Sequence, residues 1–309
     1  MRPLELVHRS LFEYVQPVAL GEHRLMFRPR DSYDLRLLDT TLAIDPAAEI
    51  RWLHDPFGNS IALATFAAPT QKLEFVSTIT LEHYGQRSSA PPIEPHAREL
   101  PFSYATDEAP DLGRFIERHY SDPDGAVLLW ARPFLHDAES NGTYETLSRM
   151  CEAIRSSFTY SMRFEFGTQT PVTTLQRKSG TCRDFALLMM EAARGFGLAA
   201  RFVTGYLYDP ALDAGDGREA GSAYPHAWME VYLPGGGWIQ FDPTNGLEMV
   251  GELIRVAVAR DPEQAMPIKG SFTGPPGACI NAITEVKVRA IPSTSPSSGT
   301  VSQALAAAA

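Results

Sequence analysis

Apolar and polar residues alternate in the first part of the chain, and this alternation predicts β-strands. Between Leu4 and Tyr14 every second residue belongs to one phase, and charged residues occupy several of the positions between them. A period of two residues is typical of a strand that buries one face. Further strands are expected at 22–30, 41–45, 50–57, 60–67 and 72–84. No helical period competes with them, so we predict an N-terminal antiparallel β-sandwich domain over residues 1–90.

The pattern then changes from strands to helices. Residues 91–110 lie in a stretch rich in Ser, Pro, Ala and Glu that lacks periodicity, and we interpret them as a linker. From Tyr144 to Phe158 apolar residues recur at spacings of three and four, which predicts an amphipathic helix. Cys151 lies in this apolar stripe and is expected to be a small, buried core residue.

Helices and strands together define the expected second domain, residues 111–290. Other helices are expected at 111–119, at 125–131 and from Cys182 to the glycines at 195 and 197. Strands are expected at 201–208, 226–233, 238–242, 252–259 and 280–290. The predicted fold class is therefore α+β, with helices packed on an antiparallel sheet in this core. The tail, residues 291–309, has no charged side chain and is expected to be disordered.

Residues 179–186 have the pattern of a loop that becomes a helix with a cysteine in its first turn. Thr181 and Asp184 have the spacing of a capping box, in which each side chain accepts the backbone N–H of the other residue. Cys182 is then the first helical residue, and its own amide stays unpaired. The free amides and the positive end of the helix favour a thiolate at Cys182 and a developing oxyanion beside it.

A predicted hairpin carries a histidine and an aspartate. Its strands are 226–233 and 238–242, joined by a glycine-rich turn. If Tyr232 lies opposite Trp238, His226 and Asp242 fall on the same face and close enough to interact. A loop shorter by one residue would put them on opposite faces, and the sequence alone leaves this register open.

Cys182, His226 and Asp242 together supply a nucleophile, a base and an orienting acid. An imidazole can take the proton of the thiol and later protonate a leaving amine. A carboxylate on the far imidazole nitrogen fixes the tautomer and orientation of the ring. The same residue types are also legitimate zinc ligands, which is an alternative interpretation of the three.

The composition narrows the class of partner. The chain has 309 residues, 44% of them hydrophobic, and a formal net charge of −10. Such a charge argues against nucleic acid and anionic membranes as partners. No apolar run is long enough for a membrane span, and the N-terminus lacks the apolar core of a signal peptide. Three scattered cysteines fit a reduced compartment, so a cytoplasmic location is expected, with no cofactor and no bound metal.

The chain resembles the bacterial transglutaminase-like superfamily, which has a papain-like cysteine-hydrolase core. The matching core motifs are SGTCRDFA at 179–186, RFVTGY at 201–206, HAW at 226–228 and WIQFDPT at 238–244. The first part of the chain is similar to the β-rich domain that precedes this core in many bacterial members. Its matching points are His8, Pro17-Val18, Pro29-Arg30 and residues 55–59. The resemblance covers residues 1 to about 290 and implies a Cys-His-Asp triad at Cys182, His226 and Asp242.

The resemblance implies a common intermediate, an acyl-enzyme on the cysteine, but several activities. Water gives hydrolysis of an amide bond, and an amine gives transamidation; some members are catalytically dead. We predict a cysteine-dependent amide-bond hydrolase, a protease or peptide amidase, with a peptide or protein as substrate. A protein-glutamine transamidase (crosslinking) and a non-catalytic interaction module are the alternatives. The oligomeric state stays open.

Two residues near the predicted triad have open roles. Trp228 could wall an acyl-binding tunnel, together with Trp238, or simply pack in the core. Gln176, six residues before Cys182, could supply a second oxyanion donor or lie on the loop surface. A calcium site at Asp213 and Asp216 is a weak alternative to a solvated acidic loop, because no closing bidentate glutamate follows.

Overall fold

The structure is a computed structural model that describes residues 2–85, 91–135, 142–163, 167–208, 222–223 and 225–291. The loop that carries Asp213 and Asp216 and the tail from residue 292 onwards lie outside the described residues. The predictions of a calcium site and of a disordered tail therefore stay predictions.

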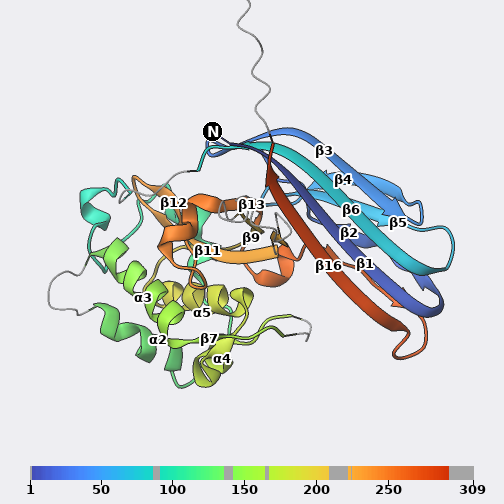
Figure 1. The fold of residues 1–309 in the computed structure, drawn as a ribbon. Coiled ribbons are helices and arrows are strands. Elements are labelled where there is room, and N and C mark those ends of the chain that lie inside the picture. The colour runs from blue at the N-terminus through green and yellow to red at the C-terminus, as the bar shows by residue number, and fades with distance from the viewer. Residues whose placement is uncertain are drawn as a thin grey trace, which may run out of the picture.

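The N-terminal part folds as two antiparallel sheets packed face to face (Figure 1). Its strands are β1 (Arg2–Leu20), β2 (His23–Leu25), β3 (Leu35–Asp45), β4 (Glu49–His54), β5 (Ser60–Thr65) and β6 (Thr70–His83). β1, β6 and β3 are neighbours in one sheet, and β2, β5 and β4 in the other. Apolar side chains from both sheets meet between them, among them Val18, Leu25 and Phe75. The predicted sandwich is therefore present.

The alternation that predicted β1 corresponds to its burial. Leu4, Leu6, His8 and Ser10 are all at most 2% exposed, and charged residues lie between several of them. Leu4 and Leu6 belong to the same continuous apolar cluster as the helices of the second domain. One face of the sandwich is thus covered by the core rather than by solvent.

The last strands return to the N-terminal domain. They are β14 (Ile268–Lys269), which pairs with β2, β15 (Phe272–Thr273), which pairs with the end of β1, and β16 (Cys279–Ala290). β16 runs antiparallel along β1 from Ala290, opposite Leu4, to Cys279, opposite Tyr14. The prediction that assigned residues 111–290 to the core is corrected here, because β16 completes the sandwich. Alternation in a sequence identifies a strand, but it does not say which edge the strand will pair with.

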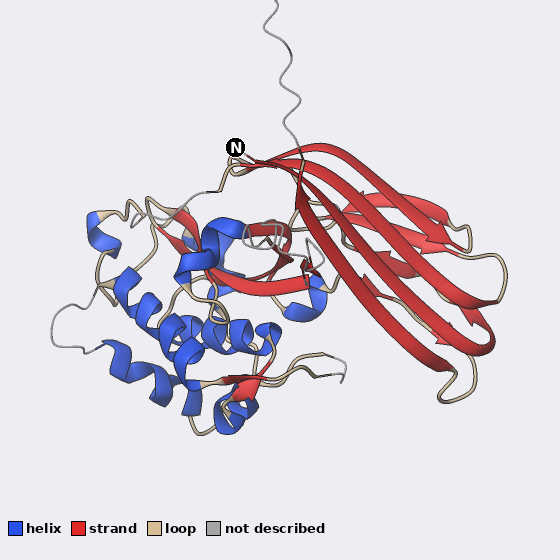
Figure 2. Ribbon diagram, viewed as in Figure 1, coloured by secondary structure: helices blue, strands red, loops and turns tan. Residues whose placement is uncertain are grey.

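The core combines a four-stranded antiparallel sheet with a group of helices. The strand order is β12 (Gly237–Phe241), β11 (Pro225–Leu233), β9 (Ala200–Leu207) and β13 (Leu253–Ala259). The helices are α1 (Ala109–Ile116), α2 (Ala126–Ala131), α3 (Thr143–Ser157), α4 (Pro171–Arg177) and α5 (Cys182–Gly195). α2 to α5 gather on the side of this sheet away from the sandwich (Figures 1 and 2). The fold class is α+β, as predicted.

Short elements connect these parts. Two-residue strands occur at β7 (Thr159–Tyr160), β8 (Ser179–Gly180) and β10 (Ser222–Ala223), and β10 pairs with β16. Short 3-10 helices occur at Pro95–Ala97, Arg132–Leu135, Leu247–Glu252 and Pro262–Ala265. The first of them lies in the predicted linker.

Hydrogen bonds of Asn59 and His8 join the sandwich to the core sheet. The turn at Gly58 and Asn59 connects β4 and β5, and Gly58 has a φ of +77°. The Asn59 amide donates to the carbonyl of Val258 at 2.6 Å and accepts from its N–H at 2.9 Å. Nδ1 of His8 lies 2.9 Å from the Tyr206 hydroxyl on β9. The side chain of Asn59 thus pairs with the outer edge of β13 as a further strand would.

This contact makes a prediction about stability. Asn59→Ala leaves both backbone groups of Val258 without their partner in a buried place. We expect the free energy of unfolding to fall by about 2–4 kcal/mol, since each unsatisfied buried group costs about 1–3 kcal/mol. Urea denaturation measures the change. Asn281→Ala is the control, because its amide bonds Glu13 in a partly exposed place and should cost less than about 1 kcal/mol. Equal losses of unfolding free energy in the two variants would show that the bonds of Asn59 to Val258 do not hold the sandwich to the core sheet.

Candidate active site

Thr181 and Asp184 form a capping box at the start of α5, as predicted. The Asp184 carboxylate accepts the Thr181 amide at 2.8 Å and the Thr181 hydroxyl at 3.0 Å. Cys182 is the first residue of the helix, and its amide has no hydrogen-bond partner among the described residues. The sulfur therefore lies at the positive end of α5, next to a free N–H.

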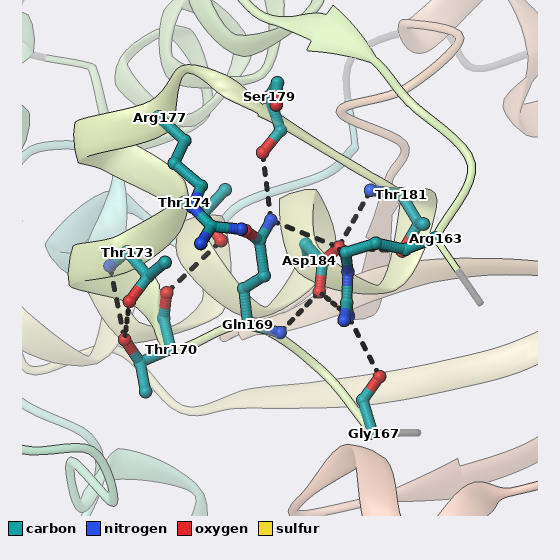
Figure 3. A network of polar contacts seen from close by, with 10 residues as sticks. All are labelled: Arg163, Gly167, Gln169, Thr170, Thr173, Thr174, Arg177, Ser179, Thr181 and Asp184. Carbon is teal, nitrogen blue, oxygen red and sulfur yellow. Dashed lines mark hydrogen bonds and ion pairs between the residues drawn. The ribbon is translucent and has the colours of Figure 1, made fainter. Parts of the chain in front are cut away.

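Asp184 also organises the chain around this helix start (Figure 3). Its carboxylate is fully buried and accepts two bonds from the Arg163 guanidinium, at 3.0 and 3.2 Å, and one from the Gln169 amide at 2.7 Å. Burial alone would raise the pKa of Asp184, but the Thr181 amide and Arg163 outweigh it and lower that pKa. The carboxylate is thus held ionised, with donors on every side.

Gly180 is required by this packing. A Cβ atom on it would lie 2.8 Å from Cβ of Asp184 and 2.9 Å from Nε2 of Gln169. Nε2 of Gln169 also donates to the Ser179 carbonyl at 2.9 Å, and Oε1 accepts from Arg177 at 3.0 Å. No side chain fits at residue 180 without displacing the capping carboxylate or its amide partner. Residue 180 is thus a glycine because a Cβ atom has no room there.

The hairpin of β11 and β12 has the register on which the predicted site depended. Tyr232 lies opposite Trp238, and Met229 lies opposite Phe241. His226 and Asp242 consequently come together, with Nε2 of His226 2.7 Å from Oδ2 of Asp242. A carboxylate can only accept, so Nε2 carries the proton and donates it to Asp242.

Asp242 is fully buried and has further donors that the sequence analysis missed. Oδ1 accepts the Thr244 amide at 2.9 Å, and Oδ2 accepts Nδ2 of Asn245 at 2.9 Å. The same Nδ2 lies 3.2 Å from Nε2 of His226. The only signal for Asn245 in the sequence is its place in the turn that follows Asp242. These donors fix the carboxylate against the imidazole.

His226 is held in its charged form. Burial disfavours an imidazolium, but the Asp242 charge and its hydrogen bond overcome this and raise the pKa of His226 to about 10. A side-chain hydrogen bond with Cys182 adds to the effect. Since Nε2 is bonded to Asp242, Nδ1 is the nitrogen left for the thiol. The pKa of His226 in the folded protein lies above its ordinary value of about 6.5. Protonation of His226 therefore makes its full contribution to the stability of the fold below pH 6.5. That contribution is lost as the pH rises toward 10.

The three cysteines differ in their surroundings. Cys182 is 8% exposed, and His226 beside it is 9% exposed. Cys151 is fully buried on α3, as predicted, and burial raises the pKa of its thiol, with a further contribution from the Asp242 charge. Cys279 is partly exposed at the start of β16. Among the three, Cys182 alone has a charged histidine as its neighbour.

The two candidate substrate-binding residues lie in different places. Gln176 is exposed on α4 and makes no hydrogen bond among the described residues; the glutamine that contacts the helix start is Gln169. Trp228 is completely buried and stacks on His226, with ring centroids 6.0 Å apart and an angle of 22°. It packs with Val203 and neighbouring apolar residues. Trp228 therefore supports the imidazole ring by stacking on it. No contact among the described residues indicates that Trp228 lines a tunnel.

Two features are absent from the described residues. No group of three or more His, Cys, Asp and Glu side chains there is arranged to hold a metal ion. Within the same ranges, no helix has the length and apolar character needed to cross a membrane.

Comparison with known sequences identifies the family of each part of the chain. The transglutaminase-like superfamily matches residues 131–243, and the bacterial transglutaminase-like N-terminal region matches residues 4–82. The core of the chain, residues 131–243, therefore belongs to the transglutaminase-like superfamily. An uncharacterised protein of Mycobacterium tuberculosis is 29% identical, with 93% of this chain and 92% of that protein covered.

Two further similarities differ in what they cover. The crystal structure of a candidate cysteine protease from Cytophaga hutchinsonii has a TM-score of 0.69 at 18% identity, covering 94% of this chain and 91% of that one. At this identity the likeness shows the fold. A protein-glutamine gamma-glutamyltransferase of Pseudomonas aeruginosa is 33% identical over 88 residues, which is 28% of this chain and 13% of that protein.

The charge of Asp242 makes a prediction about His226. In Asp242→Asn the burial remains while the main charge that raises the pKa is gone. We expect the pKa of His226 to fall from about 10 to below its ordinary value, because burial then dominates. The pH titration of the ring nitrogens by NMR measures it. Asn245→Ala keeps the carboxylate charge, so its His226 should stay charged at pH 8. An unchanged titration in Asp242→Asn would show that the carboxylate does not set the charge of the ring.

Proposed function

We propose that this protein is a cysteine-dependent amide-bond hydrolase, a protease or peptide amidase, that forms an acyl-enzyme on Cys182. One observation carries the proposal. The thiol lies at a capped helix start beside a histidine whose far nitrogen is 2.7 Å from a buried aspartate. Membership of the transglutaminase-like superfamily supports this class of reaction.

In the first half of the reaction the Cys182 sulfur attacks the carbonyl carbon of the amide. His226 carries the proton that the thiol gives up, and Asp242 holds the imidazolium in place. The negative charge that develops on the carbonyl oxygen is stabilised by the free amide of Cys182 and the positive end of α5. The C–N bond breaks as His226 gives its proton to the leaving amine, and a thioester remains on Cys182.

The second half releases the acyl group. His226, now neutral, takes a proton from a water molecule, which attacks the thioester carbonyl. The C–S bond breaks, the carboxylic acid leaves and the sulfur returns to its starting state. Orientation of the ring by Asp242 serves both halves, because the same nitrogen first gives and then takes the proton.

Transamidation is the second candidate. An amine in place of the water would form a new amide by the same acyl-enzyme, and the local similarity to the Pseudomonas aeruginosa enzyme favours it. The residues described above are common to both outcomes. Whether water or an amine takes the acyl group from Cys182 therefore has to be decided from the reaction product.

A peptide library supplies the test of both proposals. Wild-type protein should hydrolyse amide bonds in some members, and Cys182→Ala should reduce turnover by at least about a thousandfold. His226→Ala should cost about 10²–10⁴-fold, the usual contribution of a general acid–base. Cys279→Ala is the matched control and should keep full activity. The same assay with added lysine methyl ester decides the acceptor: free carboxylate indicates hydrolysis, and a lysine adduct indicates transamidation. Turnover that survives in Cys182→Ala would contradict the proposal.

A further inference from the structure

A short segment runs beside the start of α5 and is not explained by the chemistry above. After α3 the chain forms β7, which pairs in parallel with β8, so that Tyr160 lies opposite Gly180. The Ser161 amide continues this pairing by donating to the Gly180 carbonyl at 2.9 Å. β8 leads directly into Thr181 and Cys182, so the segment lies along the side of the helix start.

Two large apolar side chains on this segment are exposed. Tyr160 is 53% exposed and Met162 is 68% exposed. Single exposed apolar residues are common, so the exposure alone decides nothing. Their position does: Tyr160 lies opposite Gly180, which precedes Cys182 by two residues. Tyrosine offers a large apolar ring, and the flexible side chain of methionine adapts to an apolar partner.

The backbone at Tyr160 is free on its outer side. In a parallel pair, alternate residues direct their N–H and C=O groups to the neighbouring strand. Thr159 and Ser161 do so, with their amides bonded to the carbonyls of Lys178 and Gly180. The N–H and C=O groups of Tyr160 therefore point away from β8. Among the described residues, no strand other than β8 pairs with β7.

The segment is held firmly at both ends. Before it, the Phe158 ring packs edge-on against Phe185 of α5, with centroids 5.9 Å apart. After it, Arg163 bonds the buried Asp184 carboxylate that also caps α5 (Figure 3). The free edge of β7 and the Cys182 thiol are thus held in fixed positions relative to each other by contacts to α5. A surface ordered in advance binds at a lower entropic cost than a mobile one.

We propose that the free edge of β7 binds the substrate peptide as an added strand, and that Tyr160 and Met162 contact a large apolar side chain of that peptide next to the scissile carbonyl. The proposal rests on the proposed function, because it assigns the substrate class of the same site. Backbone bonds at Tyr160 give affinity for any extended peptide, and the two side chains select its apolar residue.

Peptide probes that alkylate thiols test this without knowledge of the natural substrate. Two acetylated tripeptides carry a chloroacetamide group, one with phenylalanine and the other with serine beside it. Iodoacetamide is the small reference reagent. Mass spectrometry measures the rate at which each modifies Cys182. The phenylalanine probe should react about tenfold faster than the serine probe, the discrimination that an apolar contact usually gives.

Substitutions on the segment should remove this preference alone. In Tyr160→Ala/Met162→Ser the phenylalanine probe should slow about tenfold, while iodoacetamide keeps its rate within twofold. Leu129→Ala, at an exposed apolar residue of α2, is the control and should change neither rate. An N-methyl group on the phenylalanine amide of the probe should also slow it, because that group blocks one backbone bond.

Different failures have different meanings. Equal rates for the two peptide probes on wild-type protein overturn the assignment of the edge, even where amide turnover depends on Cys182. A concentration-dependent dimer that the double substitution abolishes, with no preference between the probes, would show that the edge pairs with a second copy and would also overturn it. Absence of turnover that depends on Cys182 would instead be a failure of the proposed function.

Discussion

The register of one hairpin is the constraint on which the candidate site depends. Tyr232 opposite Trp238 brings His226 and Asp242 onto the same face. A slip of one residue would put His226 and Asp242 on opposite faces and leave the Asp242 carboxylate without its partner. An uncompensated buried charge costs several kcal/mol, so the site and the fold of the hairpin stabilise each other. The charged pair is therefore part of the architecture as well as of the chemistry.

A second buried carboxylate does for the nucleophile what Asp242 does for the base. Asp184 caps α5 and binds Arg163 and Gln169, which come from the segments before the helix. Cys182 is placed by a helix start that cannot shift without breaking these bonds. The two halves of the site are thus fixed independently, one by a cap and one by a strand register. They meet where α5 reaches the end of β11.

Much of this arrangement is local in the sequence and could be predicted. The capping box depends on two residues three apart, and the burial of Leu4, Leu6 and Cys151 follows from periodicity. The hairpin register was one of two possibilities that a sequence cannot separate, because loop length and turn geometry decide it together. The partner of β16 could not be predicted, since its pairing with β1 joins residues between 265 and 286 positions apart. Arg163, Gln169 and Asn245 were missed for a related reason. Each bonds a buried carboxylate, and nothing in its own neighbourhood marks it.

The sandwich makes hydrogen bonds and apolar contacts with the core. Asn59 pairs with the edge of β13, His8 bonds Tyr206, and apolar residues of β1 enter the same cluster as α5. β9 lies between β13 and β11, so the sheet that carries His226 is supported from the side of the sandwich. The sandwich contributes none of Cys182, His226 and Asp242, but its contacts support the sheet that carries His226.

The central claim is that Cys182 and His226 form a charged, reactive pair. The most direct test is the rate of alkylation of Cys182 by iodoacetamide as a function of pH, measured beside Cys279 in the same molecules. Wild-type Cys182 should react faster than Cys279 and keep its rate well below pH 8, and His226→Ala should move its profile to higher pH. A profile of Cys182 that coincides with that of Cys279, or that is unchanged in His226→Ala, would contradict the account.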